Sequence, residues 1–262
     1  MKLNNFKKLS FFVIILINLN LVLNAFGFGV ETHKTINSYI ADESSSIYGS
    51  YLHNYLQKNL GLHDGIKTIF DSKMAKIWIS DGGASEDNHP RPLAHFHNPL
   101  TNEGLWGRNI SAREWALLPI YTQRTTPFVH LPLQQILFSG ADYSWHDSRY
   151  YYYRALWSDN KADSEKYFAE TFRGLGQVMH LVQDMSVPAH VRGSMHPPPF
   201  WNDSYEKWAK SKENIDRFVT EYPVHFYEHN SLFPLTIKNL FDTDQYEEGT
   251  NPPNITSAFT IG

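Results

Sequence analysis

The chain has 262 residues, a formal charge of −4 and no cysteine. Its length is enough for one sizeable domain or two small ones. The lack of cysteine excludes disulfides, thiolate zinc sites and thiol nucleophiles. Any zinc would have to be held by His, Asp and Glu, which suits an open catalytic site better than a closed structural one. Thirteen histidines can supply such ligands.

The first 27 residues have the pattern of a secretory signal peptide. Residues 2–8 contain three lysines and no acid, and residues 11–25 are mostly apolar. An apolar run of this length is short for a membrane span, which needs about 20 residues. Cleavage after Gly27 would give a mature chain beginning at Phe28, and cleavage after Ala25 is the alternative. We therefore expect a secreted or periplasmic protein, with an uncleaved anchor as the competing interpretation.

The net charge bears on the class of substrate. Removal of the signal peptide would take away three of the 23 basic residues, so the formal charge would fall from −4 to −7. A uniformly acidic surface repels the phosphates of nucleic acids, although it is compatible with a local cationic site. The charge therefore argues mildly against a nucleic-acid substrate.

The rest of the chain shows helical spacing, and no alternating apolar run is long enough to require a sheet. The sequence therefore predicts one all-α domain covering residues 28–262. The predicted helices are residues 31–42, one or two helices within 49–79 that break at Gly61 and Gly65, and residues 147–157, 163–185 and 204–221. Residues 81–108 are rich in glycine and proline and are predicted to form a long loop. Residues 251–262 end without a capped element, so we expect the natural domain to continue.

The segment 163–185 gives the clearest helix prediction. Its apolar residues repeat at spacings of three and four, at Phe168, Phe172, Leu175, Met179 and Val182. Asp163 or Ser164 can cap the start of this helix, as Thr32 can cap the first predicted helix. An aromatic content of 15% is enough to fill a compact helical core around it.

The end of this helix contains three potential metal ligands around a proline. His180 and Asp184 are four residues apart, so they share a face of the helix. Pro188 should stop the helix, because proline lacks an N–H and disfavours helix in the residue before it. His190 would then follow on irregular backbone and fold back towards the other two. Alone, this pattern also fits a core histidine, so the other histidine groups decide the interpretation.

Two further histidine groups lie earlier in the chain. His33 is five residues after Phe28, whose amine and carbonyl could chelate a metal once the signal peptide is removed. A free α-amine has an ordinary pKa of about 8, so a metal can displace its proton. The predicted loop contains Asp87, His89, His95 and His97 close together in the sequence, with Asp81 just upstream. Combined with the helix-end residues, these groups favour a metal site over surface histidines and a merely polar loop.

These segments resemble those of the bacterial zinc-dependent phospholipases C, whose all-helical fold is shared with fungal and plant single-strand-specific nucleases. Residues 172–190, FRGLGQVMHLVQDMSVPAH, resemble the central helix of that family. The segment HFHNP from His95 is similar to the family's HFYDP. The segment FGVETH from Phe28 is similar to its mature N-terminus, which usually begins with tryptophan. The similarity runs from residue 28 to about residue 210, and implies a compact multi-helix domain of the zinc-dependent phospholipase C type.

The resemblance implies a site with two to three zinc ions, in which Asp184 bridges two of them. The first zinc would also be held by His180, His95 and an upstream Asp. Asp87 is favoured as this ligand, because its ED pair in a GAxED context resembles a bacterial subgroup. Asp81 lies 14 residues before His95, fits the usual spacing and stays open as the alternative. If Asp87 is the ligand, Asp81 is a candidate general base.

The ligand sets that the resemblance implies for the second and third zinc ions match this sequence less completely. The second zinc would also be held by His33 and by the amine and carbonyl of the new N-terminus. The third would be held by His190, a later His and an acid four residues beyond that His. Glu206 fits the acid, but an asparagine stands where the family has the His. His196 or Asp203 is the expected replacement.

The implied chemistry is hydrolysis of a phosphodiester by a metal-activated water. Zinc ions a few ångströms apart polarise the P–O bonds and ionise a water between them, so no nucleophilic side chain is needed. The substrate would be a phospholipid headgroup ester or another phosphodiester. Peripheral membrane contact is compatible with this function, and no stable protein partner is implied.

Three other functions compete with this one. The same metals could act on single-stranded nucleic acid, which stacking platforms and a basic groove would favour. An intracellular-type His-Asp phosphohydrolase would use His63–Asp64 or His146–Asp147, but the signal peptide and the poor context of those pairs disfavour it. A non-catalytic homologue is the third, because asparagine at position 202 and phenylalanine at position 28 depart from the family pattern.

Overall fold

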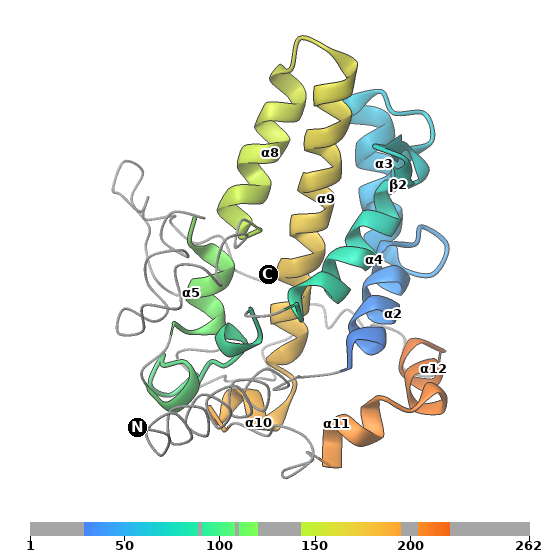
Figure 1. Cartoon of the computed structure of the whole chain (residues 1–262). Helices are drawn as coiled ribbons and strands as arrows, with labels where there is room; N and C mark the ends of the chain where they lie inside the picture. Colours follow the sequence, from blue (N-terminus) through green and yellow to red (C-terminus); the bar gives the residue numbers. More distant parts are fainter. Residues whose placement is uncertain (1–28, 89–90, 108–109, 120–142, 195–203, 221–262) are drawn as a thin grey trace, which may run out of the picture.

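The computed structural model describes residues 29–88, 91–107, 110–119, 143–194 and 204–220. These residues are mostly helical, as expected for the predicted all-α class. The only sheet among them is an antiparallel pair of two-residue strands, β1 (Ile69–Phe70) and β2 (Lys73–Met74). The α-helices in Figure 1 are α2 (Val30–Ala41), α3 (Ile47–Leu60), α4 (Ala75–Glu86), α5 (Ala112–Leu117), α8 (Trp145–Trp157), α9 (Lys161–Asp184), α10 (Pro188–Val191), α11 (Ser204–Ala209) and α12 (Lys212–Thr220). The 3-10 helices are η1 (Gly65–Lys67), η2 (Arg91–Ala94) and η3 (Leu105–Gly107).

Helix α9 runs through the middle of the structure and is its main scaffold (Figure 1). It packs against α8 on one side and α4 on the other, and α2 packs against α4 in turn. Its predicted apolar stripe is buried at Phe168 and Phe172, whose rings contact Phe70 from the strand pair. The helix predicted over residues 163–185 is therefore confirmed, as Lys161–Asp184.

Helices α4 and α9 approach each other closely at two glycines. A Cβ atom at Gly82 would collide with a backbone carbonyl of α9, and one at Gly176 would collide with the carbonyl oxygen of Ile79. Glycine lets two backbones meet because no side chain stands between them. The prediction of a loop from residue 81 is wrong for this reason, since α4 continues through its glycines to Glu86.

The starts of two helices differ from the predicted caps. Helix α9 begins after Asn160, whose side chain accepts a hydrogen bond from the N–H of Asp163, so neither Asp163 nor Ser164 is the cap. Helix α2 begins after Gly29, so Thr32 lies inside the helix. Asparagine is among the best capping residues because its side-chain oxygen can reach the exposed N–H groups of the first turn.

The segment after α9 is more regular than predicted. Pro188 opens the short helix α10, because proline's fixed φ angle suits the first position of a helix. His190 therefore lies in helical backbone and not on an irregular segment. Helix α5 was not predicted, although Ser111 and Glu114 form a capping box at its start.

One predicted helix break is confirmed, and one helix predicted as continuous is broken. Gly61 ends α3 in the left-handed conformation, with φ +67°, which confirms the break there. The helix predicted over residues 204–221 is two helices, α11 and α12, which meet at Lys210 and Ser211.

Several predictions fall outside the described residues. These are the signal peptide at residues 1–27, Phe28, His196, Asn202, Asp203 and the chain beyond residue 220. In the part of the chain that is described, no helix combines the length and apolar character needed to cross a membrane.

Candidate metal centre

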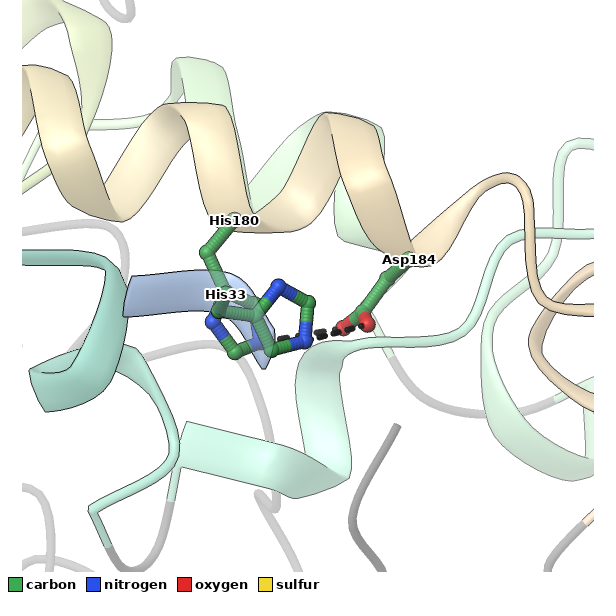
Figure 2. A group of neighbouring side chains, drawn as sticks. All are labelled: His33, His180 and Asp184. Atoms are coloured by element: carbon green, nitrogen blue, oxygen red, sulfur yellow. Dashed lines mark ion pairs between the residues drawn. The ribbon is translucent and has the colours of Figure 1, made fainter. Parts of the chain in front are cut away.

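The end of α9 and the start of α2 bring His33, His180 and Asp184 together, as Figure 2 shows. All three side chains are fully buried. The His33 and His180 rings stack with their centroids 3.5 Å apart, and each directs a nitrogen at the Asp184 carboxylate. The predicted convergence of these residues is therefore present, and their ligand atoms lie within 4.8 Å of one another.

The two oxygens of Asp184 face different partners. Its Oδ1 lies 3.3 Å from Nε2 of His33. Its Oδ2 lies 2.9 Å from Nδ1 of His95 and 3.2 Å from Nε2 of His180. A single carboxylate thus stands between two sets of potential ligands, one on each oxygen.

A second group of potential ligands shares His180 with the first. Asp87, at the end of α4, places Oδ1 3.6 Å from Nε2 of His180 and 3.8 Å from Nδ1 of His95. The nitrogens of His95 and His180 are themselves 3.3 Å apart. Asp87, His95 and His180 are all buried, and their ligand atoms also lie within 4.8 Å of one another.

The tautomer of His180 shows which atoms are available to a cation. Its Nδ1 lies 2.7 Å from the carbonyl oxygen of Gly83, so it carries a hydrogen and donates it. In the neutral ring, Nε2 then has a lone pair, and it faces the oxygens of Asp87 and Asp184. Metal-binding histidines characteristically donate their other ring N–H in this way, which fixes the ring and its tautomer.

The spacing of these atoms fits a divalent metal. Zinc bonds of about 2.0–2.2 Å at tetrahedral angles place the ligand atoms about 3.4 Å apart. The distances among Asp87, His95, His180 and Asp184 run from 2.9 to 3.8 Å. Neither oxygen of Asp87 accepts a hydrogen bond from the described residues, although both are buried. The buried His and Asp side chains can therefore hold a metal ion.

His190 and Glu206 lie beside this group. Nδ1 of His190 donates to the carbonyl oxygen of His95 at 2.8 Å, and its Nε2 lies 3.8 Å from Oε1 of Glu206. Both side chains are buried. The predicted pairing of His190 with Glu206 is thus present, while the partner expected at His196 or Asp203 lies outside the described residues.

Asp81 is placed apart from the cluster. Its carboxylate pairs with Nζ of Lys73 at 2.7 Å and with Nζ of Lys34 at 3.8 Å, and its side chain is partly exposed. Of the two candidate upstream ligands, only Asp87 joins the buried histidines. This geometry gives no support to Asp81 as either a ligand or a general base.

Glu86 is a buried carboxylate that the sequence analysis overlooked. Its Oε2 accepts hydrogen bonds from Arg91, its Oε1 accepts one from the Trp115 indole at 2.8 Å, and Oε1 faces Nε2 of His95 at 3.6 Å. Because Nδ1 of His95 faces Asp184, Glu86 stands behind the ring and orients it. The adjacent Asp87 faces the cluster instead, so the ED pair divides into one supporting carboxylate and one ligand.

The buried charges shift the pKa values of the metal-free site. Burial alone would lower the pKa of His95, but Asp184 and Glu86 outweigh it and raise the pKa to about 10. Burial and the neighbouring His33 lower the pKa of His180. Burial would raise the pKa of Asp184, but His190 and His180 outweigh it and hold the pKa well below its ordinary value. A proton on His95 therefore compensates the carboxylates when no metal is bound.

Comparison of the chain with family models, curated proteins and solved structures gives no significant match. The relation to zinc-dependent phospholipases C therefore stays a prediction from the motifs. The case for a metal site rests on the positions of the side chains themselves.

Proposed function

We propose that the protein is an exported zinc-dependent phosphodiesterase of the phospholipase C type, which hydrolyses headgroup esters of phospholipids. The observation that carries this proposal is the Asp184 carboxylate, whose two oxygens face two different sets of buried histidines. A carboxylate in that position suits a pair of metals better than one. The sequence motifs support the choice of family, and the positions of Asp184 and the histidines support a site for more than one metal.

The ligands divide between the two oxygens of Asp184. On the Oδ2 side, His95, His180 and Asp87 would hold the first zinc. On the Oδ1 side, His33 would hold the second, together with the amine and carbonyl of the new N-terminus. A third zinc would be held by His190 and Glu206 with a further ligand from residues 195–203.

The chain's own residues bind and orient the reacting groups. When bound, zinc would polarise the P–O bonds of a phosphodiester and lower the pKa of a water, which would supply the nucleophile. Gly83 fixes the ring of His180 through its carbonyl, and Glu86 supports that of His95. The burial of the ligands limits water around them, so their charges act more strongly than they would in solvent.

The proposal is tested by zinc content and by substrate preference. Protein exported and processed by its own signal peptide should contain two to three zinc ions by elemental analysis. It should hydrolyse short-chain phosphatidylcholine faster than single-stranded DNA. Asp184→Asn should lose both activity and zinc, whereas the matched control Asp216→Asn, at an exposed residue of α12 that pairs with Lys212, should keep both.

Other outcomes would replace this function. Zinc with activity on DNA alone would favour the single-strand nuclease on the same site. A zinc content near zero in correctly folded, inactive protein would favour a non-catalytic homologue and overturn the proposal. Full activity of a chain with extra residues before Phe28 would remove the N-terminus from the ligand set.

A further inference from the structure

Asn37 occupies the point where α2, α4 and α9 meet. It is fully buried, and its Nδ2 donates to the carbonyl oxygen of Ile79 at 3.1 Å and to that of Gly176 at 3.0 Å. A Cβ atom at Gly83 would collide with this nitrogen, so the backbone of α4 leaves room for the amide. The amide therefore binds one backbone group of each neighbouring helix.

These two contacts determine which way the Asn37 amide points. Carbonyl oxygens only accept hydrogen bonds, so the atom between Ile79 and Gly176 must be the amide nitrogen. The Asn37 oxygen then faces Gln183 at 2.6 Å, and the Gln183 atom there must be its donor, Nε2. The Gln183 oxygen is left facing Nδ1 of His33 at 2.8 Å, so Nδ1 carries the hydrogen.

We propose that Asn37 and Gln183 form a directional relay of hydrogen bonds that holds His33 as its Nδ1–H tautomer and leaves Nε2 as a lone pair aimed at Asp184. Both are positioning residues, because Gln183 contacts His33 only at Nδ1, away from Asp184, and Asn37 acts through Gln183. The relay's role in metal binding rests on the function proposed above, whereas its direction depends only on the backbone carbonyls of α4 and α9.

The alternative orientation shows why the direction matters. If the Gln183 amide were flipped, its nitrogen would face Nδ1 of His33, and the ring hydrogen would move to Nε2. That hydrogen would be donated to Oδ1 of Asp184, which lies 3.3 Å away, and His33 would have no lone pair for a metal. The flip would also press the Gln183 oxygen against the Asn37 oxygen at 2.6 Å. The relay thus excludes the tautomer that cannot bind a metal.

The lone pair of His33 and the carboxylate of Asp184 are both acceptors. Two acceptors 3.3 Å apart repel each other unless a cation lies near both. The relay therefore keeps the second ligand position ready for a cation, at some expense to the stability of the metal-free protein.

The direction of the relay is tested by nitrogen-15 NMR of the histidine rings in the metal-free protein, at about pH 8.5, well above the ordinary histidine pKa of about 6.5. We expect His33 to carry its hydrogen on Nδ1. A hydrogen on Nε2 of His33 would overturn the proposal. A role of Gln183 in packing alone would not determine this signal.

The effect on binding is tested with zinc as the probe. Loss of a group that orients a metal-binding histidine typically weakens metal affinity about 10–100-fold. Gln183→Leu should weaken one zinc by that factor, leave the zinc held by Asp87 and His95 unchanged, and shift His33 towards a mixture of tautomers. Gln183→Glu should restore the Nδ1–H tautomer and most of the affinity, because a carboxylate accepts that hydrogen, while it loses stability against the Asn37 oxygen.

The matched control is Gln57→Leu, in which the lost amide donates to the carbonyl oxygen of His63, just beyond the C-terminal end of α3. It should leave zinc binding and the His33 tautomer unchanged. Equal zinc affinity in Gln183→Leu and the wild type would overturn the positioning role. If the wild type itself binds no zinc, the proposed function fails, and the tautomer of His33 still decides whether the relay exists.

Discussion

The two halves of α9 differ in what they bury. The N-terminal half buries Phe168 and Phe172 against Phe70 and the neighbouring helix α8. The C-terminal half buries His180 and Asp184 among other histidines and carboxylates. Both pairs are spaced four residues apart, but on different faces of the helix, so α9 has an apolar face towards its N-terminal end and an ionisable face towards its C-terminal end.

This difference separates the residues that stabilise the fold from those that make the site. Apolar burial stabilises a protein without depending on a bound metal or on the protonation of side chains. Buried charges cost stability unless a partner or a metal compensates them. Metal and pH should therefore affect the C-terminal half of α9, whereas core substitutions should affect the N-terminal half.

The largest effect is expected at the residue shared by both ligand sets. Asp184→Asn should remove more than one equivalent of zinc and lower phosphodiesterase activity about 10³-fold or more, because metals supply several kcal/mol of transition-state stabilisation. Zinc content and turnover would be measured on the same sample. A near-normal zinc content would show that this carboxylate does not bridge two metals.

A core substitution in the other half should act on stability and not on zinc. Phe172→Ala should lower the free energy of unfolding by about 3–5 kcal/mol, the usual cost of truncating a buried aromatic residue. Chemical denaturation would measure it, with Trp157→Ala at a side chain that is 72% exposed as the control. Loss of zinc from folded Phe172→Ala protein would mean that the two halves are not separable.

Asp81, within α4, and Asp87, just after its end, offer a sharper comparison. Asp87→Asn should weaken one zinc about 100-fold, because it removes a carboxylate that faces His95 and His180. Asp81→Asn should leave zinc affinity within about twofold, since its carboxylate pairs with lysines. Isothermal titration of zinc into the metal-free variants would measure both. The opposite order would restore Asp81 as the ligand.

The sequence predicted the parts of the site that depend on local spacing. His180 and Asp184 share a face because they are four residues apart on a helix whose apolar pattern is clear. The convergence of His33 and His95 on that face came from a family resemblance, since no local pattern reports contacts between distant segments. Val182 shows the limit of the pattern, because it continues the apolar spacing yet is 56% exposed.

The errors have physical causes in packing between helices. Gly82 and Gly83 suggested a loop, but there they permit α4 to approach α9 and Asn37. Glu86 and Asp87 are adjacent acids, and only the turn at the end of α4 sends one to Arg91 and Trp115 and the other to the histidines. Helix propensity cannot predict whether such glycines lie in a helix or where such acids point, because both depend on contacts with a neighbouring helix.

The smallest and most specific effect is the pH dependence of the metal-free protein. His95 has an ordinary pKa of about 6.5 when unfolded, and Asp184 and Glu86 raise it to about 10 against the effect of burial. This stabilisation is fully present below pH 6.5 and is lost as the pH rises through 10. Between those values the free energy of unfolding should fall by about 1.4 kcal/mol per pH unit. Zinc must displace the same proton, so its affinity should rise about tenfold per pH unit over that range.

Denaturation and zinc titration from pH 7 to 9 would test both slopes in the wild type, in His95→Asn and in the exposed-site control His63→Asn. The pH dependence of both the unfolding free energy and the zinc affinity should persist in the control and vanish in His95→Asn. If stability and zinc affinity changed in the same direction with pH, the proton that zinc replaces would not be the one on His95.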